Sequence, residues 1–254
     1  MAPLLEFKDI SMAYHSIDQE THAISHLTFS VSQGEFVAIV GPSGCGKSTI
    51  LNLICGLLSP ESGQILIEGK NAGESGINIG YMLQKDHLFE WRTIFRNVML
   101  GPEIAGCVTA EKKAYAYQLL DSYGLKEFAN ARPSQLSGGM RQRAALIRTL
   151  VMEPSLLLLD EPFSALDYQT RLNVSDDIGK IIRQESITAI LVTHDIAEAI
   201  SMADRVIILT SRPATVSSIV DINLTVEPRT PLASRNAPEF KNYFNRIWKE
   251  LNQP

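Results

Sequence analysis

Cysteine is scarce in this sequence: its 254 residues include three, at positions 45, 55 and 107. An odd number of scattered cysteines fits neither a disulfide framework nor a zinc site, because both need paired or clustered thiols. A chain of this length buries about 70–75% of the surface that its unfolded form exposes, so it needs no cross-links. We therefore expect a globular protein of a reducing compartment.

Long hydrophobic runs and strong charge are missing too. The most apolar segments, residues 50–58 and 187–192, are shorter than the roughly 20 residues that span a bilayer. Early charges at Glu6, Lys8 and Asp9 leave no room for the apolar core of a signal peptide. The net charge is −5 without any run of five like charges, whereas nucleic-acid binders usually present a basic face. We expect neither a membrane-spanning chain nor a nucleic-acid partner.

What is present is an alternation of apolar strands and helical stretches. Residues 27–41 indicate a strand, a turn at Gln33-Gly34 and a second, almost wholly apolar strand, which is typical of a sheet covered on both faces. A helix is expected over residues 46–58, and further strands over residues 63–69, 155–160, 187–195 and 206–210. This order predicts a mostly parallel α/β core.

Two parts of the chain differ from this core. Helices are expected over residues 97–100, 110–123 and 139–150, without an apolar strand between them. The tail carries Phe240, Phe244, Ile247, Trp248 and Leu251 on one face of a helix, which favours docking onto the protein's own core over a membrane-surface role. We predict an α/β core of residues 1–84 and 152–212, a helical insertion of residues 85–151, and a C-terminal extension of residues 213–254.

A glycine-rich segment, GPSGCGKST, stands directly after a predicted strand and directly before a predicted helix. It matches G-x-x-x-x-G-K-[S/T], in which glycines let backbone N–H groups and the helix N-terminus face phosphate oxygens. Lys47 would contact the outer phosphates, and the Ser48 hydroxyl would ligate Mg²⁺. The segment predicts a nucleotide site made of Gly41, Pro42, Ser43, Gly44, Cys45, Gly46, Lys47, Ser48 and Thr49.

Two adjacent carboxylates, Asp160 and Glu161, end the apolar strand SLLLLDEP. Successive side chains of a strand point in different directions, so Asp160 can serve Mg²⁺ while Glu161 accepts a proton from an attacking water. His194 ends another predicted strand and would reach the γ-phosphate or that water at the same sheet edge. No N-K-x-D guanine-reading motif is present, which disfavours a GTPase.

Two further side chains are candidates. Gln84 begins the helical insertion, where an amide can ligate Mg²⁺ or orient water. Tyr14 could stack on adenine, although a packing role is almost equally plausible from the sequence. The predicted catalytic set is thus Lys47, Gln84, Glu161 and His194, and the predicted metal ligands are Ser48, Gln84 and Asp160. The other histidines, at positions 15, 22, 26 and 87, are interpreted as surface residues.

A second anion-binding corner lies in the insertion, where Ser137, Gly138 and Gly139 precede a helix in QLSGGMRQR. Its hydroxyl and N–H groups resemble those of the phosphate loop. One chain's phosphate loop already encloses its own nucleotide, so this corner would face outward. We expect a head-to-tail pair in which Ser137 of one subunit closes over the γ-phosphate bound by Lys47 of the other.

Together, GPSGCGKST, Gln84, LSGGMRQR, LLLLDEP, SALD (residues 164–167) and VTHD resemble the ATP-binding-cassette ATPases over nearly the whole chain. The resemblance implies a P-loop NTPase (RecA-like) core with an N-terminal antiparallel β portion and an inserted α-helical subdomain. It implies ATP and Mg²⁺ as cofactors, Tyr14 against adenine, Gln84 in the Q-loop, Asp167 between the two sites and His194 as the switch histidine.

The resemblance also implies partners. A permease subunit in the membrane would insert a cytoplasmic helix beside the Q-loop, where Leu88, Phe89 and Trp91 are candidate contacts, packing within the insertion being the alternative. FEWRT, SRP at residues 211–213 and the tail are similar to ATPases of nitrate, sulfonate, taurine and pyrimidine-precursor importers. Glu90, commonly proline there, and Ile147-Arg148-Thr149, commonly alanine-arginine-alanine, depart from that group.

The sequence therefore predicts the ATP-hydrolysing subunit of an importer for a small solute. It would act as a homodimer or paired with a similar ATPase, at the cytoplasmic face of the inner membrane, with permease subunits and, through them, a solute-binding protein. The alternative is a soluble ATPase of the same family without a membrane partner, although such proteins usually carry two cassettes or coiled-coil insertions. A plain phosphotransferase is disfavoured by LSGGM.

Overall fold

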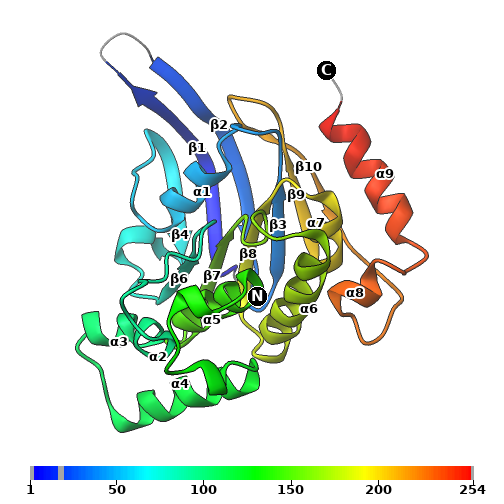
Figure 1. Ribbon diagram of the computed structural model, residues 1–254. Coiled ribbons are helices and arrows are strands. Elements are labelled where there is room, and N and C mark those ends of the chain that lie inside the picture. Colours follow the sequence, from blue (N-terminus) through cyan, green and yellow to red (C-terminus); the bar gives the residue numbers. More distant parts are fainter. Residues whose placement is uncertain (1–2, 17–19, 253–254) are drawn as a thin grey trace.

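Two β-sheets organise the protein, as seen in a computed structural model that describes residues 3–16 and 20–252 (Figure 1). The smaller sheet is antiparallel in the order β2-β1-β4-β5. It consists of β1 (Leu5–His15), β2 (Glu20–Val31), β4 (Ser62–Ile67) and β5 (Lys70–Asn71). This sheet is the antiparallel N-terminal portion that the resemblance implied.

The larger sheet has the order β10-β9-β3-β8-β7-β6. Its strands β9, β3, β8, β7 and β6 run parallel to one another, and β10 joins the edge antiparallel to β9. The bounds are β3 (Phe36–Val40), β6 (Ile79–Met82), β7 (Leu156–Asp160), β8 (Thr188–Thr193), β9 (Arg205–Leu209) and β10 (Val216–Asp221). The expected mostly parallel α/β core is confirmed.

Strand β3 lies at the centre of the larger sheet and belongs to two hydrophobic cores at once. Its side chains alternate, so that Phe36, Ala38 and Val40 enter one core while Val37 and Ile39 enter the other. All of these residues are 2% exposed or less. This is the period-2 pattern of a strand covered on both faces, and it explains the almost continuous apolar run.

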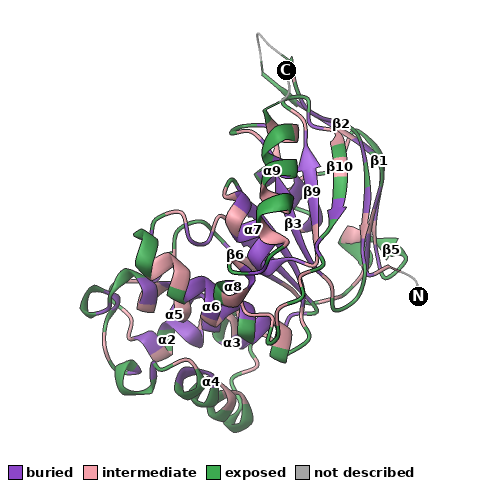
Figure 2. Cartoon of the chain, turned by 90° about the vertical axis from the view of Figure 1, so that its right-hand side faces the viewer, coloured by how far each residue is buried: buried purple, intermediate pink, exposed green. Residues whose placement is uncertain are grey.

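Helix α1 (Lys47–Ile54) packs with the antiparallel sheet on one face of the larger sheet. The other face is covered by the helical insertion and the later helices. The insertion contains α2 (Ile94–Val98), α3 (Leu100–Ile104), α4 (Ala110–Ser122), η2 (Lys126–Phe128), η3 (Pro133–Gln135) and α5 (Gly138–Leu150). Figure 2 shows that α4 is the outermost of these helices, with a largely exposed surface.

The last helices cover the remaining part of that face. Helices α6 (Tyr168–Gln184) and α7 (Ile196–Met202) flank the sheet, α8 (Pro231–Ser234) packs on both, and α9 (Phe240–Leu251) packs on α7 and β9. In α9, Ile247 is fully buried, Phe240, Phe244 and Leu251 contact the core, and Trp248 is 56% exposed. The apolar face of this helix docks onto the protein itself, as its periodicity indicated.

Several elements differ from the sequence expectation. Helix α1 ends at Ile54 instead of residue 58, because Gly56 takes a φ of 69° that breaks the helix. Two elements before Gln84 were not predicted, namely strand β6 and the 3₁₀ turn η1 (Ala72–Glu74). Tyr14 lies within β1, a strand that the apolar pattern did not predict. The predicted extension of residues 213–254 includes β10, which is part of the sheet. Among the described residues, no helix combines the length and apolarity needed to cross a membrane.

Candidate functional site

The glycine-rich loop connects the end of β3 to α1, as its sequence context predicted. Gly44 and Gly46 have φ angles of 73° and 127°, which side chains with a Cβ disfavour. The Lys47 ammonium lies across the loop, with Nζ 2.9 Å from the carbonyl oxygen of Gly41 and 3.0 Å from that of Pro42. The buried Lys47 ammonium therefore links the start of the loop to its end, beside the N-terminus of α1.

A cavity of about 240 Å³ lies over this loop. Its lining includes loop residues, the carboxylate Glu161 and a cation from far along the chain: Ser43, Gly44, Gly46, Lys47, Ser48, Thr49, Glu161 and Arg212. Cys45 is not among these lining residues, because its side chain is 1% exposed and belongs to the core. Burial raises the pKa of this thiol, although the Lys47 charge and hydrogen bonds oppose the effect. The cavity offers backbone N–H groups and positive charge to a ligand with phosphate oxygens.

The two carboxylates at the end of β7 have different surroundings. Asp160 accepts hydrogen bonds from Ser48 Oγ at 3.4 Å and from Tyr81 Oη at 3.3 Å. Burial raises its pKa, and these hydrogen bonds offset the rise in part. Glu161 has a φ of 45°, an uncommon conformation for a residue with a side chain that often occurs at functional sites. The strand end thus separates the two side chains, as expected from strand geometry.

His194 lies at the end of β8, next to β7 in the sheet, and its Nδ1 is 3.0 Å from Glu161 Oε2. Gln84 is linked to the backbone of Glu161 through two hydrogen bonds. Its Nε2 donates to Ser164 Oγ at 3.2 Å, and Ser164 Oγ donates to the Glu161 carbonyl oxygen at 3.0 Å. The structure therefore brings Glu161, His194 and Gln84 together at one sheet edge, which is the usual place for a ligand in open α/β sheets.

Ligands for a magnesium ion are available at this edge. The hydroxyl of Ser48 and the carboxylate of Asp160 are adjacent, and the Gln84 amide donates through its nitrogen, which leaves its carbonyl oxygen for a ligand. All three groups offer oxygen, the donor atom that Mg²⁺ prefers. The residues present fit the ion, and its binding here remains a prediction.

Tyr14 reaches the loop from the antiparallel sheet. Its hydroxyl is 3.0 Å from Thr49 Oγ1 at the start of α1, and 42% of the residue is exposed. This contact fixes one end of the ring beside the phosphate loop and leaves part of the ring accessible. Stacking on a base remains a prediction.

The corner formed by Ser137, Gly138 and Gly139 does not join this cavity within one chain. Ser137 is the N-cap of α5 and accepts a hydrogen bond from the Met140 N–H at 3.3 Å. Gly139 packs so closely on α6 that a Cβ there would come within 2.9 Å of Thr170 Cγ2. Ser137 and Gly138 are exposed, in contrast to Gly139. The corner is anchored on one side and presents its first polar groups to the surroundings.

The segment LFEWRT divides between packing and exposure. Leu88 is 6% exposed and belongs to the core, whereas Trp91 is 72% exposed and stacks on Phe89 at a centroid distance of 4.8 Å. Glu90 forms an ion pair of 2.9 Å with Arg141 of α5. Leu88 therefore packs inside the protein, which was the alternative interpretation. Trp91 is the side chain that gives this segment an exposed apolar surface.

Known proteins are similar to this chain over most of its length. A family model described as ABC transporter matches residues 24–164 of the chain. An uncharacterized ABC transporter ATP-binding protein of Bacillus subtilis, YtlC, is 46% identical over 248 residues, which cover 98% of this chain and 95% of the relative. The chain belongs to the ABC transporter family.

Other members of the ABC family extend the comparison. The nitrate import ATP-binding protein NrtD of Synechocystis is 38% identical over 247 residues, 96% of this chain and 93% of the relative. The ATP-binding cassette MJ0796, solved as a dimer bound to ADP and Pi, superimposes with a TM-score of 0.74 at 30% identity, covering 86% of this chain and 99% of that one. Like its relatives, this ABC protein is an ATPase with a P-loop NTPase fold that binds ATP.

Sequence reasoning missed two side chains of this ABC site. Tyr81, on the unexpected strand β6, contacts Asp160, and its pKa is raised by burial and by that carboxylate. Arg212, from the turn between β9 and β10, donates to the Gly44 carbonyl oxygen from Nη2 at 2.7 Å and from Nε at 3.1 Å. The SRP motif drew attention to Arg212, but its distance of 168 positions from Gly44 hid the contact.

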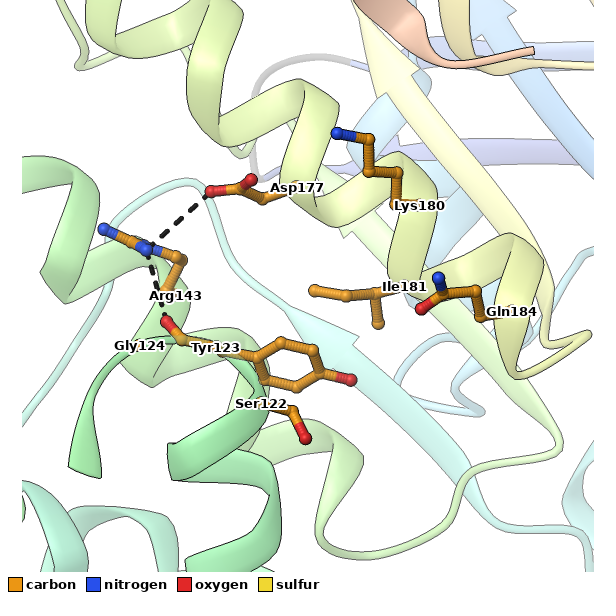
Figure 3. A pocket seen from close by; sticks show the side chains of 8 residues that line it. All are labelled: Ser122, Tyr123, Gly124, Arg143, Asp177, Lys180, Ile181 and Gln184. Atoms are coloured by element: carbon orange, nitrogen blue, oxygen red, sulfur yellow. Dashed lines mark hydrogen bonds and ion pairs between the residues drawn. The ribbon is translucent and has the colours of Figure 1, made fainter. Parts of the chain in front are cut away.

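A further cavity of the ABC protein, of about 280 Å³, lies elsewhere, between α4, α5 and α6 (Figure 3). Arg143 lies in its wall, 3.2 Å from the Tyr123 carbonyl oxygen and 3.8 Å from Asp177 Oδ2. Its charges of both signs are paired, since Lys180 also binds Asp176. None of its lining residues belongs to the phosphate loop or to the carboxylate pair. We assign this cavity to the packing of the helical insertion.

Proposed function

We propose that this ATPase powers an importer of small solutes and works as a homodimer, or as a pair with a similar ATPase, around two ATP molecules. One observation carries the shared site: the phosphate cavity lacks Ser137, Gly138 and Gly139, while Ser137 and Gly138 are exposed at a helix N-terminus. A second subunit facing this corner would complete the cavity over the γ-phosphate. The dimeric MJ0796 cassette, bound to ADP and Pi, supports this arrangement.

Within each site the chain's own residues divide the work. Lys47, Ser48 and the loop N–H groups would hold the phosphates and position Mg²⁺ together with Asp160, and the ion would neutralise charge that develops during phosphoryl transfer. Glu161 would accept the proton of the attacking water, a role that contributes roughly 10²–10⁴-fold in rate. His194, hydrogen-bonded to Glu161, would orient that carboxylate and contact the γ-phosphate.

The partner at the membrane would be a permease subunit that contacts the Q-loop region. Trp91 and Ile104 are 72% and 79% exposed, and Leu83, next to Gln84, is 41% exposed. Exposed apolar side chains near a segment that carries a site residue fit a docking surface for an apolar helix. The ATPase would then lie at the cytoplasmic face of the inner membrane, and a solute-binding protein would join the system through the permease.

The transported solute would be a small anion or a heterocycle. Similarity to a nitrate import ATP-binding protein over 96% of this chain supports nitrate within the predicted group of nitrate, sulfonate, taurine and pyrimidine-precursor importers. The alternative, a soluble ATPase of this family without a membrane partner, lacks a supporting observation of comparable weight. Purification from detergent-solubilised membranes distinguishes the two proposals, because the first requires a polytopic protein to purify together with this chain.

The shared site is tested by Glu161→Gln. This variant keeps the shape of the side chain but loses the basic carboxylate, so we expect ATP hydrolysis to fall by about 10²-fold or more while ATP binding persists. With MgATP the variant should accumulate as a dimer, measured by light scattering coupled to size exclusion. Glu74→Gln, on the exposed turn η1, is the matched control and should behave as the parent. A Glu161→Gln protein that binds ATP yet stays monomeric would contradict the shared site.

A further inference from the structure

Three carbonyl groups of the phosphate loop accept hydrogen bonds from two cations, one within the loop and one far along the chain. Lys47 binds the Gly41 and Pro42 carbonyl oxygens from inside the loop. Arg212 binds the Gly44 carbonyl oxygen with two N–H groups, Nη2 at 2.7 Å and Nε at 3.1 Å. Each is a charge-assisted hydrogen bond, stronger than one between neutral groups. The conformation of the loop therefore depends on a residue outside the motif that defines it.

The direction of one N–H group follows from the contact with Arg212. In a planar trans peptide the C=O and the N–H point in opposite directions. Fixing the Gly44 carbonyl toward the guanidinium therefore turns the N–H of Cys45 away from it. That N–H donates to the Pro42 carbonyl oxygen at 3.3 Å, which closes a turn inside the loop. Gly44, with a φ of 73°, is a residue whose peptide can rotate easily, so an external constraint matters at this position.

Arg212 is itself held in place by the sheets. Its turn is tied to β2 by two backbone hydrogen bonds, from Ala214 N to Ala23 O at 2.9 Å and from Ser25 N to Ala214 O at 3.0 Å. Within the turn, Thr215 N donates to Thr210 Oγ1 at 3.0 Å. The guanidinium also lines the cavity that contains Lys47 and Glu161. It therefore brings a second positive charge to the space in which phosphates would lie.

We propose that Arg212 is a positioning residue for the nucleotide phosphates. It acts by fixing the Gly44–Cys45 peptide, and with it the turn of the phosphate loop that the Cys45 N–H closes on Pro42, and by adding positive charge at the edge of the cavity. The proposal rests on the assignment of residues 41–49 as the nucleotide site. Because the loop and this charge would act on phosphates present in both ATP and ADP, the effect of Arg212 concerns binding of both nucleotides more than the hydrolytic step.

The experiment compares four variants by equilibrium titration with fluorescent ATP and ADP analogues and by steady-state ATPase assays. Arg212→Met should raise the Kd for both nucleotides about tenfold, which is the usual effect of one charge-assisted hydrogen bond. KM for ATP should rise in parallel, with kcat changed less than about threefold. Arg212→Lys, which keeps a donor and the charge, should recover part of the affinity. Thr215→Val is the matched control, because it removes a hydroxyl from the same turn without touching Arg212, and its affinity should equal that of the parent.

The fourth variant, Lys47→Met, separates this proposal from the site assignment. If Lys47→Met abolishes nucleotide binding while Arg212→Met binds like the parent, the role of Arg212 is refuted and the site stands. If Lys47→Met also binds normally, the assignment of the nucleotide site is itself wrong. Equal loss in Thr215→Val and Arg212→Met would attribute the effect to the turn, and equal loss in Arg212→Lys and Arg212→Met would argue against a cation at the Gly44 carbonyl.

Discussion

Glu198 is a buried carboxyl whose pKa is strongly raised. It is 3% exposed, and its Oε2 accepts a hydrogen bond from Thr193 Oγ1 at 2.7 Å. Burial raises its pKa to about 7, although the hydrogen bond from Thr193 and the charge of Arg171 oppose the rise. Thr193 directly precedes His194, so this buried carboxyl lies beneath one side of the candidate site.

The raised pKa of Glu198 makes the stability of the fold depend on pH. Between the ordinary pKa of 4.5 and about 7, the folded state binds more protons at Glu198 than the unfolded state. The free energy of unfolding should therefore fall as the pH rises through this window, by about 3 kcal/mol at most from this residue. Glu198→Gln stays neutral, so it should be more stable than the parent at pH 8 and similar to it near pH 4.5.

Urea unfolding of both proteins at several pH values measures this difference directly. Glutamine still accepts the hydrogen bond from Thr193, so the comparison isolates the charge. A constant difference in unfolding free energy between pH 5 and pH 8 would show that Glu198 is ionised throughout.

Helix α5 controls the conformation of the segment that follows Gln84. Arg148 donates to the carbonyl oxygens of Asp86 and His87 at 2.7 Å each. Two turns earlier, Arg141 binds the carboxylate of Asp86 at 2.9 Å and that of Glu90 at 2.9 Å. Burial would raise the pKa of Asp86, but the hydrogen bonds from Arg141 and the Leu88 N–H outweigh it and lower the pKa. Helix α5 therefore holds the segment of residues 86–90 through two arginines.

Arg148→Met should release this segment, because methionine fills the volume but cannot bind the two carbonyl groups. We expect the amides of residues 86–91 to exchange with deuterium faster, and the global unfolding free energy to fall by about 2 kcal/mol. Exchange measured by mass spectrometry on peptides from this region tests the prediction. The control is Arg96→Met, an exposed arginine of α2 in the same insertion, which should leave exchange of residues 86–91 unchanged.

The elements that position the site could be predicted where the local sequence pattern alone determines the structure. A glycine-rich loop between an apolar strand and a helix has few alternatives, and the ends of β7 and β8 follow from apolar runs that stop at charged residues. Strand β6 escaped prediction because Gly80 interrupts a short run. That glycine allows close packing, since a Cβ there would lie 2.6 Å from Thr149 Cγ2. The contact of Arg212 with Gly44 could not be predicted, because it depends on sheet order and not on spacing.

At the scale of the whole molecule, the exposed corner at the start of α5 should act on a neighbouring subunit. Ser137→Arg introduces a bulky cation at an exposed position, so we expect the isolated subunit to fold and bind ATP normally. Hydrolysis should nevertheless fall by at least about tenfold, because the arginine would block closure over the partner's nucleotide. Ser134→Arg, exposed on η3 nearby, is the matched control and should retain activity.

Mixing experiments make the test specific for action between subunits. A heterodimer of Ser137→Arg with Lys47→Met contains one site that carries both defects and one site that carries neither, if Ser137 acts on the partner. Such a mixture should recover part of the activity that each variant lacks alone. Lack of any recovery, with heterodimers present, would place the effect of Ser137 within its own chain.

The position of β3 in the sheet has a consequence for how the chain is made. The two strands that flank it, β8 and β9, begin at Thr188 and Arg205, so both are synthesised long after Phe36–Val40 has left the ribosome. Until then this strand, the most apolar of the sheet, has no lateral hydrogen-bonding partner. Pairing β3 with β8 and β9 therefore closes a loop that contains most of the polypeptide. A nascent chain that stops at residue 164 would contain every residue of the phosphate loop and both carboxylates, yet not the neighbours that hold the loop's strand in place. Vectorial synthesis thus delays assembly of the catalytic edge until translation is nearly complete.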